Sequence, residues 1–328
     1  MFNCITISPK YANQESIQKF IESGCNMFRL NFSWGTHEEY RQIVKIIREV
    51  ALKLGQEVQI LQDLQGPKLR IQNCPEAKEI KPQDKILISY DKIPKHIQLA
   101  ASGIYQTESI GKHILVKDGD IKLTIIDVDQ QKQTATLESQ SMGSFKNMNG
   151  CNAPSIELNL EALSIKDLSD LQFALEQNID IISLSFIHNE QNLIQLKNIV
   201  QDKAKILAKI ETQTAVNNIQ SILKHADYCM VARGDLGVEV GLTELPYAQE
   251  KIQAECNKQN IPCLIATEVL KSMLTEKHPS RAESHDIHDS LDKGAAGFIL
   301  TNETVLGENP FLATQWISKF LDDYKKHK

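Results

Sequence analysis

The chain has 328 residues, of which 41% are apolar and 24% are charged, and its formal net charge is −6 at pH 7. This composition is typical of a globular protein, and the acidic balance argues against a general nucleic-acid partner. No apolar run approaches the roughly 18 residues of a membrane-spanning helix, and the first residues do not resemble a signal peptide, so we expect a cytoplasmic protein without a membrane partner.

Three short apolar runs near the start of the chain predict strands, and the first two are followed by helical patterns. Residues 3–7 form the first run, and the amphipathic segment behind it should end near Gly24. Residues 25–32 form the second run, and a longer amphipathic helix behind it should end at Gly55. Residues 57–63 form the third run, which leads into the segment LQGPKLR.

Residues 71–154 interrupt this alternation of strands and helices. They contain short segments with partial apolar alternation and Asp-Gly turns, which predict a small all-β insertion. An insertion at the end of the third strand would hang over one end of the sheet and could act as a mobile lid. A β domain without any role in function is the alternative.

The alternation resumes after the insertion with five more apolar runs, each followed by a helical pattern. These runs cover residues 179–186, 204–210, 227–232, 261–266 and 296–300. Eight strands separated by helices predict an α/β fold in which a parallel sheet closes into a (β/α)8 TIM barrel. An open doubly wound sheet is the alternative, but no strand is followed by a G-x-G-x-x-G turn.

The seven cysteines are scattered along the chain, and none belongs to a C-x-x-C pair. An odd number of cysteines without that spacing suggests neither a disulfide framework nor a zinc site. We therefore expect reduced thiols in the core or at the surface.

Charged and polar residues follow most of the predicted strands, and in a barrel these strand ends share one mouth. They are Arg29, Asn31, Ser33, Asp63, Lys68, Arg70, Ser185, Lys209, Glu211, Arg233, Asp235 and Thr267. A single carboxylate at a strand end is more often a helix cap or a solvated charge. Two acids and several cations around one opening instead indicate a site for a metal and an anion.

The residue types at the mouth predict metal-assisted handling of a phosphorylated anion. Glu211 and Asp235 are hard oxygen ligands suited to Mg²⁺ or Mn²⁺. Lys209 and Arg29 suit a phosphoryl group, because one is a compact charge and the other a flat fork of donors. Lys209 and Glu211 should leave the same face of a strand, since side chains alternate along it.

Two further residues suit a bound carboxylate. Gly234 lets backbone N–H groups approach an anion closely. Thr267, which we expect to open a helix, would add a hydroxyl and the positive end of the helix dipole.

Seven segments resemble, in order and spacing, the motifs of the pyruvate kinase family. They read MFRLNFSWGTHEEY, LQDLQGPKLRI, AKIETQTAVNNI, ADYCMVARGDLGVEV, CLIATEVLKSM, PSRAES and NETVLGENP. The resemblance covers nearly the whole chain and implies a (β/α)8 catalytic barrel over residues 1–70 and 155–328. It also implies an inserted small β-barrel lid domain over residues 71–154, and it leads us to expect that the family's usual C-terminal effector domain is absent.

The resemblance assigns roles to residues by position. The implied catalytic residues are Lys209, Thr267 and Arg29, and the implied ligands of Mg²⁺ or Mn²⁺ are Glu211 and Asp235. The implied substrate-binding residues are Arg29, Lys209, Gly234, Asp235, Thr267 and Ser185. The implied nucleotide-binding residues are Arg70, Asn31 and Lys166, and the implied monovalent-cation region comprises Asn31, Ser33, Asp63 and Lys68.

The reaction implied by the resemblance converts phosphoenolpyruvate and ADP into pyruvate and ATP. Most of the protein's work would be in-line positioning and charge neutralisation. A homodimer formed through barrel surfaces is a further expectation.

Two departures from the family pattern bear on cofactor and nucleotide use. Lys68 stands where many members have glutamate, and members with lysine here are generally those that do not need K⁺. An ammonium near Asp63 could replace the potassium charge, so we predict K⁺-independent activity. Trp34 replaces a histidine next to the nucleotide site, which bears on nucleotide affinity and choice.

Two other functions remain as alternatives. One is a catalytically degenerate binding or regulatory protein that keeps the fold, which the substitutions favour and the retained Lys209, Glu211, Asp235 and Thr267 oppose. The other is a metal-dependent lyase acting on a pyruvate enolate, which fits poorly with the β insertion and the phosphate-facing basic residues.

Overall fold

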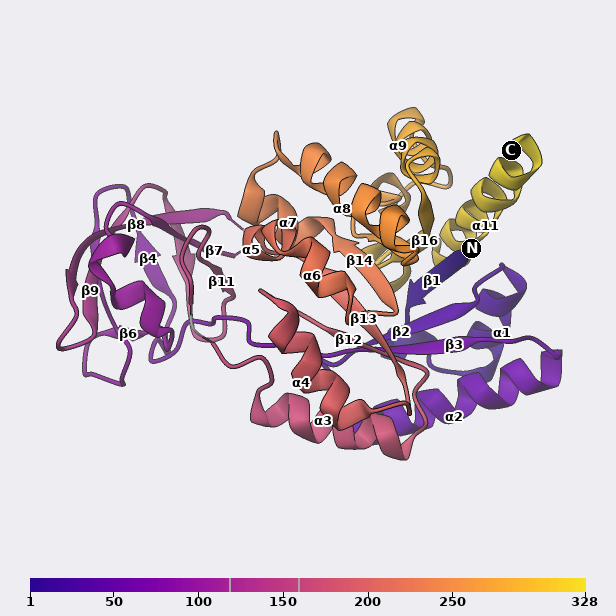
Figure 1. The fold of residues 1–328 in the computed structure, drawn as a ribbon, viewed down its shortest axis with the longest axis horizontal. Coiled ribbons are helices and arrows are strands. Elements are labelled where there is room, and N and C mark those ends of the chain that lie inside the picture. The colour runs from indigo at the N-terminus through magenta and orange to yellow at the C-terminus, as the bar shows by residue number, and fades with distance from the viewer. Residues whose placement is uncertain (118, 159) are drawn as a thin grey trace.

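The structure is a computed structural model that describes residues 1–117, 119–158 and 160–328. The barrel strands are β1 (Phe2–Thr6), β2 (Met27–Asn31), β3 (Gln59–Asp63), β12 (Ile181–Leu184), β13 (Lys205–Ile210), β14 (Tyr228–Ala232), β15 (Cys263–Ala266) and β16 (Ala295–Leu300). They form a closed parallel barrel in the order β1-β16-β15-β14-β13-β12-β3-β2 (Figure 1). The predicted (β/α)8 fold is therefore confirmed, and the open doubly wound sheet is excluded.

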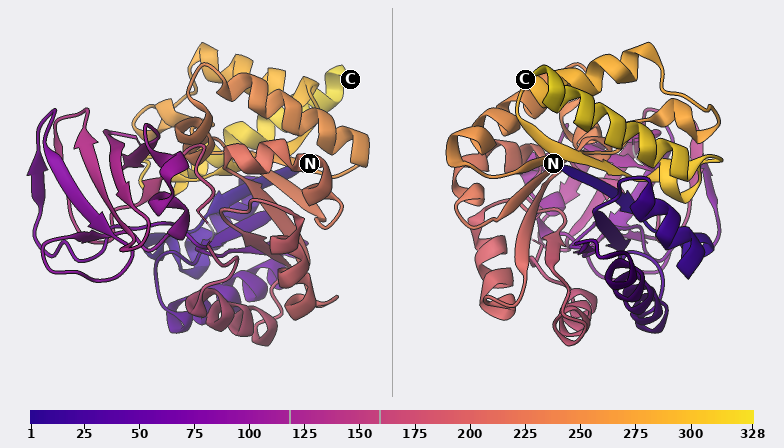
Figure 2. Two further views of the ribbon diagram at one scale, coloured as in Figure 1. Left: turned by 60° about the vertical axis from the view of Figure 1, so that its left-hand side comes forward. Right: turned by 90° about the vertical axis from the view of Figure 1, so that its right-hand side faces the viewer.

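Helices surround the barrel, as the right-hand view of Figure 2 shows. The longer ones are α1 (Gln14–Glu22), α2 (His37–Leu54), α3 (Ile165–Glu176), α4 (Glu190–Val200), α7 (Arg233–Val240), α8 (Leu245–Gln259), α9 (Arg281–Asp292) and α11 (Pro310–His327). The short ones are α5 (Gln213–Asn217), α6 (Ile219–Leu223) and α10 (Asn302–Val305), together with the 3₁₀ turns η1 (Pro9–Tyr11), η2 (Ser102–Tyr105), η3 (Thr107–Ser109) and η4 (Lys271–Leu274). Within the described ranges, no helix combines the length and the apolar character needed to cross a membrane.

Local sequence signals explain where α2 begins and ends. Thr36 and Glu39 form a reciprocal capping box at its first turn, which satisfies two backbone N–H groups that the helix itself cannot pair. Gly55 follows the last turn with φ of 64°, a left-handed conformation that glycine adopts without steric cost. The end of this helix is where the sequence predicts it.

Apolar side chains fill both faces of the barrel strands. Leu61, Leu207 and Leu264 belong to the cluster inside the barrel. Ile60 and Ile265, their neighbours in sequence, belong to the larger cluster between the strands and the helices. Burial on both faces explains why the barrel strands read as continuous apolar runs.

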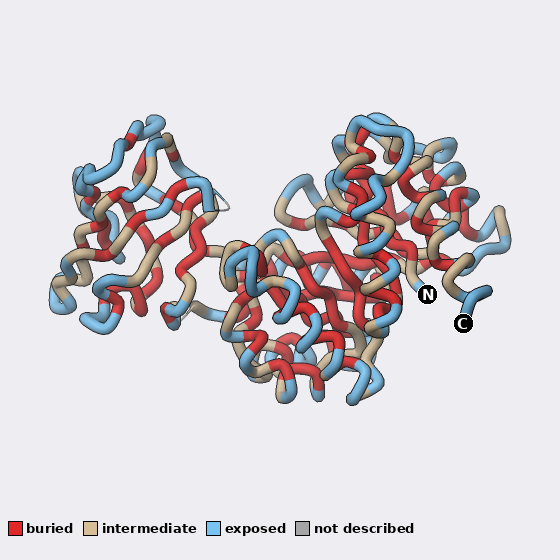
Figure 3. The backbone as a smooth tube through the Cα atoms, turned by 90° about the horizontal axis from the view of Figure 1, so that it is seen from above, coloured by how far each residue is buried: buried red, intermediate tan, exposed pale blue. Residues whose placement is uncertain are grey.

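The chain between β3 and α3 forms the predicted all-β insertion. Its strands are β4 (Lys78–Ile80), β5 (Lys85–Ser89), β6 (Ile97–Gln98), β7 (His113–Val116), β8 (Ile121–Asp129), β9 (Thr134–Ser139), β10 (Gly143–Phe145) and β11 (Cys151–Asn152). Six of them form one sheet in the order β11-β7-β8-β9-β5-β6, and β10 pairs with β4 in a second. The insertion has its own apolar core, which runs from Leu69 to Ile156, and Figure 3 shows its buried segments apart from those of the barrel.

Candidate active site

The side chain of Asp63 lies at the centre of a buried ion cluster, which is built where β3 ends. Arg29, from β2, places Nε 2.8 Å and Nη2 2.6 Å from Asp63 Oδ2. Lys209, from β13, places Nζ 3.2 Å from Asp63 Oδ1, and Ser183 Oγ donates to the same oxygen at 2.7 Å. Burial raises the pKa of Asp63, but the charges of Lys209 and Arg29 outweigh this and lower the pKa to about 2.

The ammonium of Lys209 is fixed between two strand ends. Its Nζ donates to Ser185 Oγ at 2.6 Å and lies 3.3 Å from Glu211 Oε2. Burial lowers the pKa of Lys209, but the Asp63 and Glu211 carboxylates outweigh it, so the pKa lies above its ordinary value. Lys209 is therefore a fixed positive charge at neutral pH.

Glu211 is a fully buried carboxylate with one oxygen left short of partners. Its Oε1 accepts the backbone N–H of Phe186 at 2.7 Å. Its Oε2 accepts no hydrogen bond from any described residue, although Lys209 Nζ lies nearby. Burial, followed by the charges of Asp235 and Asp63, raises the pKa of Glu211 to about 7 despite the opposing effect of Lys209. Burial is the largest cause of this shift, so the ionised form of Glu211 is disfavoured while no further cation is bound.

Asp235 lies in the first turn of α7, directly after β14. Lys68 Nζ is 2.9 Å from Asp235 Oδ1 and lies 5.1 Å from the centre of the Phe186 ring. This position corrects our expectation that the Lys68 ammonium stands beside Asp63. Within the described ranges, the cations at ion-pair distance from Asp63 are Arg29 and Lys209.

Thr267 does not open a helix, which corrects a second expectation. It follows β15 in a bend, with φ of 69°, and Glu268 behind it has φ of 53°. Two consecutive residues in the left-handed region, one of them β-branched, are costly and persist only where surrounding contacts hold them. Gly234 donates its backbone N–H to Thr267 Oγ1 at 2.7 Å, and Arg233 Nε donates to the Thr267 carbonyl at 3.0 Å.

Arg233 therefore acts on the loop rather than on the opening of the barrel. Its guanidinium also donates to the Glu268 carbonyl and pairs with Asp286 at 2.7 Å. These contacts explain how the unusual backbone of Thr267 is held next to the first turn of α7.

Gly66, in the LQGPKLR segment, is a position where only glycine fits. Its φ is 65°, and a Cβ there would stand 2.5 Å from the carbonyl oxygen of Ser185. The close approach of these two backbones brings the end of β3 against the residue whose hydroxyl holds Lys209.

A pocket of about 370 Å³ opens beside this ion cluster. Arg29, Asn31, Trp34 and Thr267 are among the residues that line it, and the side chain of Trp34 is largely exposed. Asn31 Oδ1 accepts the backbone N–H of Ser33 at 3.2 Å, which fixes the turn after β2.

Two of the predicted nucleotide-binding residues lie away from the ion cluster. Lys166, in the first turn of α3, places Nζ 2.5 Å from Asp170 and donates to the Phe32 carbonyl at 2.7 Å. Arg70 donates to the carbonyl of Met148 in the insertion at 3.0 Å, and its buried Nε has no hydrogen-bond partner among the described residues. Neither the Arg70 guanidinium nor the Lys166 ammonium lies at ion-pair distance from Asp63 or Glu211.

Comparison with known proteins agrees with the barrel fold. The family description "Pyruvate kinase, barrel domain" matches residues 3–314. The chain belongs to the pyruvate kinase family. It is 34% identical over 318 residues to a pyruvate kinase of Bacillus licheniformis, covering 94% of this chain and 54% of that protein. It is 31% identical over 334 residues to one of Staphylococcus aureus, covering 98% of this chain and 57% of that protein. The chain thus spans about half the length of these curated relatives.

Sequence reasoning missed two residues of the ion cluster. Thr6 Oγ1, at the end of β1, accepts from Arg29 Nη1 at 2.8 Å. Ser183 shares a strand face with Ser185 and binds Asp63. Both residues could have been noticed in the sequence, because each is a polar residue within a predicted apolar run, residues 3–7 for Thr6 and 179–186 for Ser183.

Proposed function

We propose that the chain transfers a phosphoryl group from phosphoenolpyruvate to ADP, giving pyruvate and ATP. The observation that carries this proposal is the position of the Lys209 ammonium, 3.3 Å from Glu211 Oε2, a buried oxygen that accepts no hydrogen bond from any described residue. A metal cation and a polyanionic substrate together would complete that arrangement. The family membership supports the same reaction.

Glu211 and Asp235 are the residues that would hold the divalent cation, Mg²⁺ or Mn²⁺. The residues fit such a cation because they offer carboxylate oxygens, which hard cations prefer, and because one of these, Glu211 Oε2, is buried without a hydrogen bond among the described residues. When bound, such a cation neutralises substrate charge and polarises the oxygens of the transferred group. Lys68 already balances part of the charge of Asp235, so it would share that carboxylate with the cation.

Lys209 and Arg29 would act on the phosphoryl group. Both cations are prearranged, since Asp63 holds them at 3.2 Å and 2.6 Å. Donors that need no rearrangement during the reaction give the largest electrostatic stabilisation of a transition state. We propose that Lys209 faces the group in flight and then the enolate oxygen left behind, while Asp63 and Ser185 hold it in position.

Thr267 and the first turn of α7 would take the carboxylate end of the substrate. Gly234 donates its backbone N–H to Thr267 Oγ1, so the hydroxyl hydrogen of Thr267 would donate to a bound carboxylate, and the Gly234 N–H would have to change partners to join it. We propose that Thr267 also lies beside the carbon that is protonated. Its strained backbone supports a functional role, because such conformations cluster at active sites.

The pocket lined by Asn31 and Trp34 would accept the nucleotide. The exposed indole of Trp34 offers a flat face to a base, and Arg29 connects the pocket to the ion cluster. Arg70 and Lys166 remain proposed nucleotide contacts, and both would have to change partners to reach a phosphate.

We also propose that residues 71–154 act as a lid over the barrel mouth. Asn152, in β11, donates to Glu239 of α7 at 3.1 Å, so the insertion contacts the helix that carries Asp235. A separate apolar core supports movement of this part as one body.

The proposed reaction is tested by coupled detection of pyruvate from phosphoenolpyruvate, ADP and Mg²⁺, with Lys209→Met beside the parent chain. Losing one prearranged donor costs about 3–4 kcal/mol, so turnover should fall by roughly 10²–10³-fold. Lys205→Met is a matched control, because Lys205 begins the same strand and its exposed side chain pairs only with Asp227 among the described acids.

The alternatives give different results in the same assay. A degenerate binding protein would form no pyruvate in the parent chain. A lyase would release pyruvate from a longer keto acid without ADP, and either outcome would overturn the proposal.

A further inference from the structure

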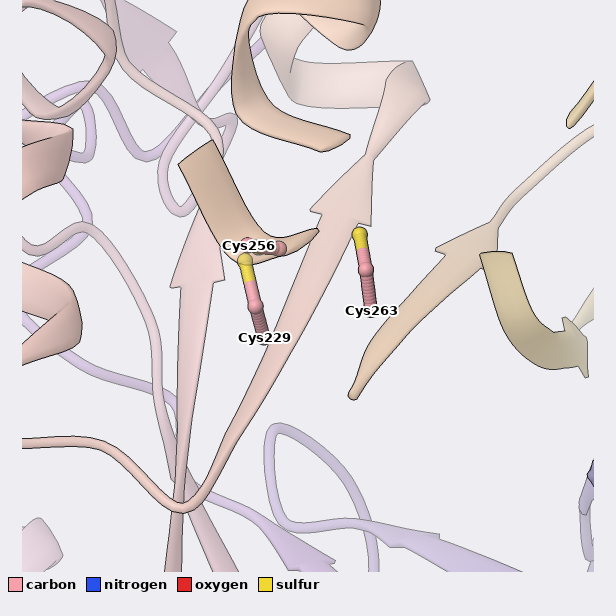
Figure 4. Close-up of side chains that lie close together, drawn as sticks. All are labelled: Cys229, Cys256 and Cys263. Carbon is pink, nitrogen blue, oxygen red and sulfur yellow. The ribbon is translucent and has the colours of Figure 1, made fainter. Parts of the chain in front are cut away.

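Three cysteines from separate parts of the sequence meet at one point outside the candidate active site. Cys229 lies in β14, Cys256 in α8 and Cys263 at the start of β15 (Figure 4). Their sulfur atoms all lie within 4.8 Å of one another. Spacing along the chain does not predict this cluster, since its members form no C-x-x-C pair.

The backbone fixes this cluster in place. Cys229 and Cys263 are direct partners in the register of β14 and β15. The N–H of Cys229 donates to the Pro262 carbonyl at 2.9 Å, and the N–H of Ile261 donates to the Cys256 carbonyl at 2.9 Å. The short connection between α8 and β15 thus holds all three elements together, and ligands arranged in advance lose little entropy on binding an ion.

All three side chains are buried, at 0%, 0% and 1% exposure for Cys229, Cys256 and Cys263. The connection that covers them is at the surface, because Asn257, Lys258 and Asn260 are exposed. A bound ion would therefore be shielded from water while lying next to a surface connection.

Thiolate sulfurs bound to one metal ion at about 2.3 Å stand about 4 Å apart, so the cluster is compact enough for a shared ion. Thiolate ligands select soft cations such as Cu⁺ and Zn²⁺. No described histidine, aspartate or glutamate joins the three cysteines within that distance. Structural Zn²⁺ is almost always four-coordinate, whereas Cu⁺ accepts three sulfur ligands.

We propose that Cys229, Cys256 and Cys263 form a three-sulfur site for a soft monovalent cation, Cu⁺ in preference to Zn²⁺. Binding would release thiol protons to the buffer and would change no oxidation state.

A cation at these cysteines would link β14 and β15, whose other ends lie at the barrel mouth. β14 begins near Cys229 and runs into Arg233 and Asp235, while β15 begins at Cys263 and runs into Thr267. A cation at the cysteines would therefore fix the starts of the strands whose ends carry two proposed active-site residues. It would do so without touching the proposed Mg²⁺ site.

The test is a titration of the full chain, reduced and freed of metal, with Cu⁺ under anaerobic conditions against a chromophoric Cu⁺ chelator. One ion per chain should bind, with an ultraviolet sulfur-to-copper charge-transfer band, and the thermal unfolding midpoint should rise with free Cu⁺. Zn²⁺ in place of Cu⁺ should bind more weakly to the same chain.

The variant Cys256→Ala should weaken Cu⁺ binding at least about 100-fold, by analogy with the losses seen when groups that support a metal site are removed. Cys229→Ala gives a second variant if the first does not fold. Cys25→Ala is the matched control, since Cys25 is also buried but lies outside the cluster, and it should bind as the parent does.

Three results would overturn the proposal. They are no uptake of Cu⁺ by the parent chain, equal uptake by Cys256→Ala and the parent, or displacement of Cu⁺ by equimolar Zn²⁺.

Discussion

Asp63 and Glu211, the two buried carboxylates at the barrel mouth, have contrasting environments. On the Asp63 side, two cations and a serine hydroxyl surround the carboxylate and lower its pKa to about 2. On the Glu211 side, one carboxylate oxygen lacks a hydrogen bond and the pKa rises to about 7. Lys209 contacts both carboxylates, so the difference between their pKa values comes from the other groups around each one.

This contrast separates a structural charge from one prepared for a ligand. A buried anion whose charge is balanced by protein cations anchors side chains and needs nothing further. A buried anion left short of partners destabilises the free protein and gains stability when a cation binds. Asp63 therefore positions Lys209 and Arg29, whereas Glu211 is the carboxylate that we propose binds the metal.

The largest expected effect comes from removing the charge on the Asp63 side. Asp63→Asn keeps the shape of the side chain but leaves Arg29 and Lys209 without their shared counter-charge. Breaking a buried pair in this way should lower the free energy of unfolding by about 3–5 kcal/mol, measured by denaturant unfolding without metal.

The control for this prediction is Asp322→Asn, because Asp322 pairs with Lys325 at the surface. Exposed pairs contribute about 1 kcal/mol or less. If the two variants lose the same small amount of stability, the Asp63 cluster is not an anchor.

The same change on the Glu211 side should act in the opposite direction. Burial raises the pKa of Glu211 to about 7, so its ionised form costs stability at neutral pH, and Glu211→Gln should leave stability without metal the same or raise it. In the parent chain, Mn²⁺ at about 100 times its dissociation constant should add about 2.7 kcal/mol, and the variant should lose this gain.

A satisfied carboxylate provides the control for the Glu211 variant. Glu303 is also buried, and its oxygens accept the N–H groups of Leu270 and Thr301 at 3.0 Å and 2.8 Å. Glu303→Gln should lower stability and keep the Mn²⁺ response. A normal Mn²⁺ response in Glu211→Gln would show that the metal lies elsewhere.

The contrast also shows what the sequence could and could not predict. The eight strands were predictable because parallel barrel strands are buried on both faces and read as apolar runs. The convergence of Lys209 and Glu211 was predictable because they stand two residues apart at a strand end. These features depend on local periodicity alone.

Features that depend on distant partners were not predictable. The place of Lys68 depends on how far a long side chain reaches across the mouth to Asp235, a residue from another strand end. The bend at Thr267 depends on Arg233, which holds the carbonyl from outside. The cysteine cluster depends on the register of two strands, which spacing along the chain does not reveal.

Acidification should lower the free energy of unfolding through Asp63 by less than the Asp63→Asn substitution does. The pKa of Asp63 falls from its ordinary 3.8 to about 2, so the ionised group stabilises the fold above about pH 4. That contribution, about 2 kcal/mol, should be lost as the pH falls through about 2. Unfolding free energies measured over this range should decline less steeply in Asp63→Asn, and equal slopes would contradict the assignment.

The smallest expected effect concerns Lys68 and K⁺. We propose that activity is K⁺-independent because Lys68, Lys209 and Arg29 already supply positive charge at the mouth. Rates in potassium and tetramethylammonium buffers should therefore be equal in the parent chain. Lys68→Gln should be slower in tetramethylammonium by roughly fivefold, which corresponds to about 1 kcal/mol for a partly exposed pair, and K⁺ should restore part of the rate.

The dependence of activity on Mn²⁺ shows where Lys68 acts. Because Lys68 lies against Asp235, its loss should also change the Mn²⁺ concentration at half-maximal activity, whereas the acid stability set by Asp63 should stay the same. The exposed Lys203 gives the control, since Lys203→Gln should change neither quantity. Strong K⁺ activation of the parent chain would contradict the proposal, because it would mean that the lysines leave the mouth short of a monovalent charge.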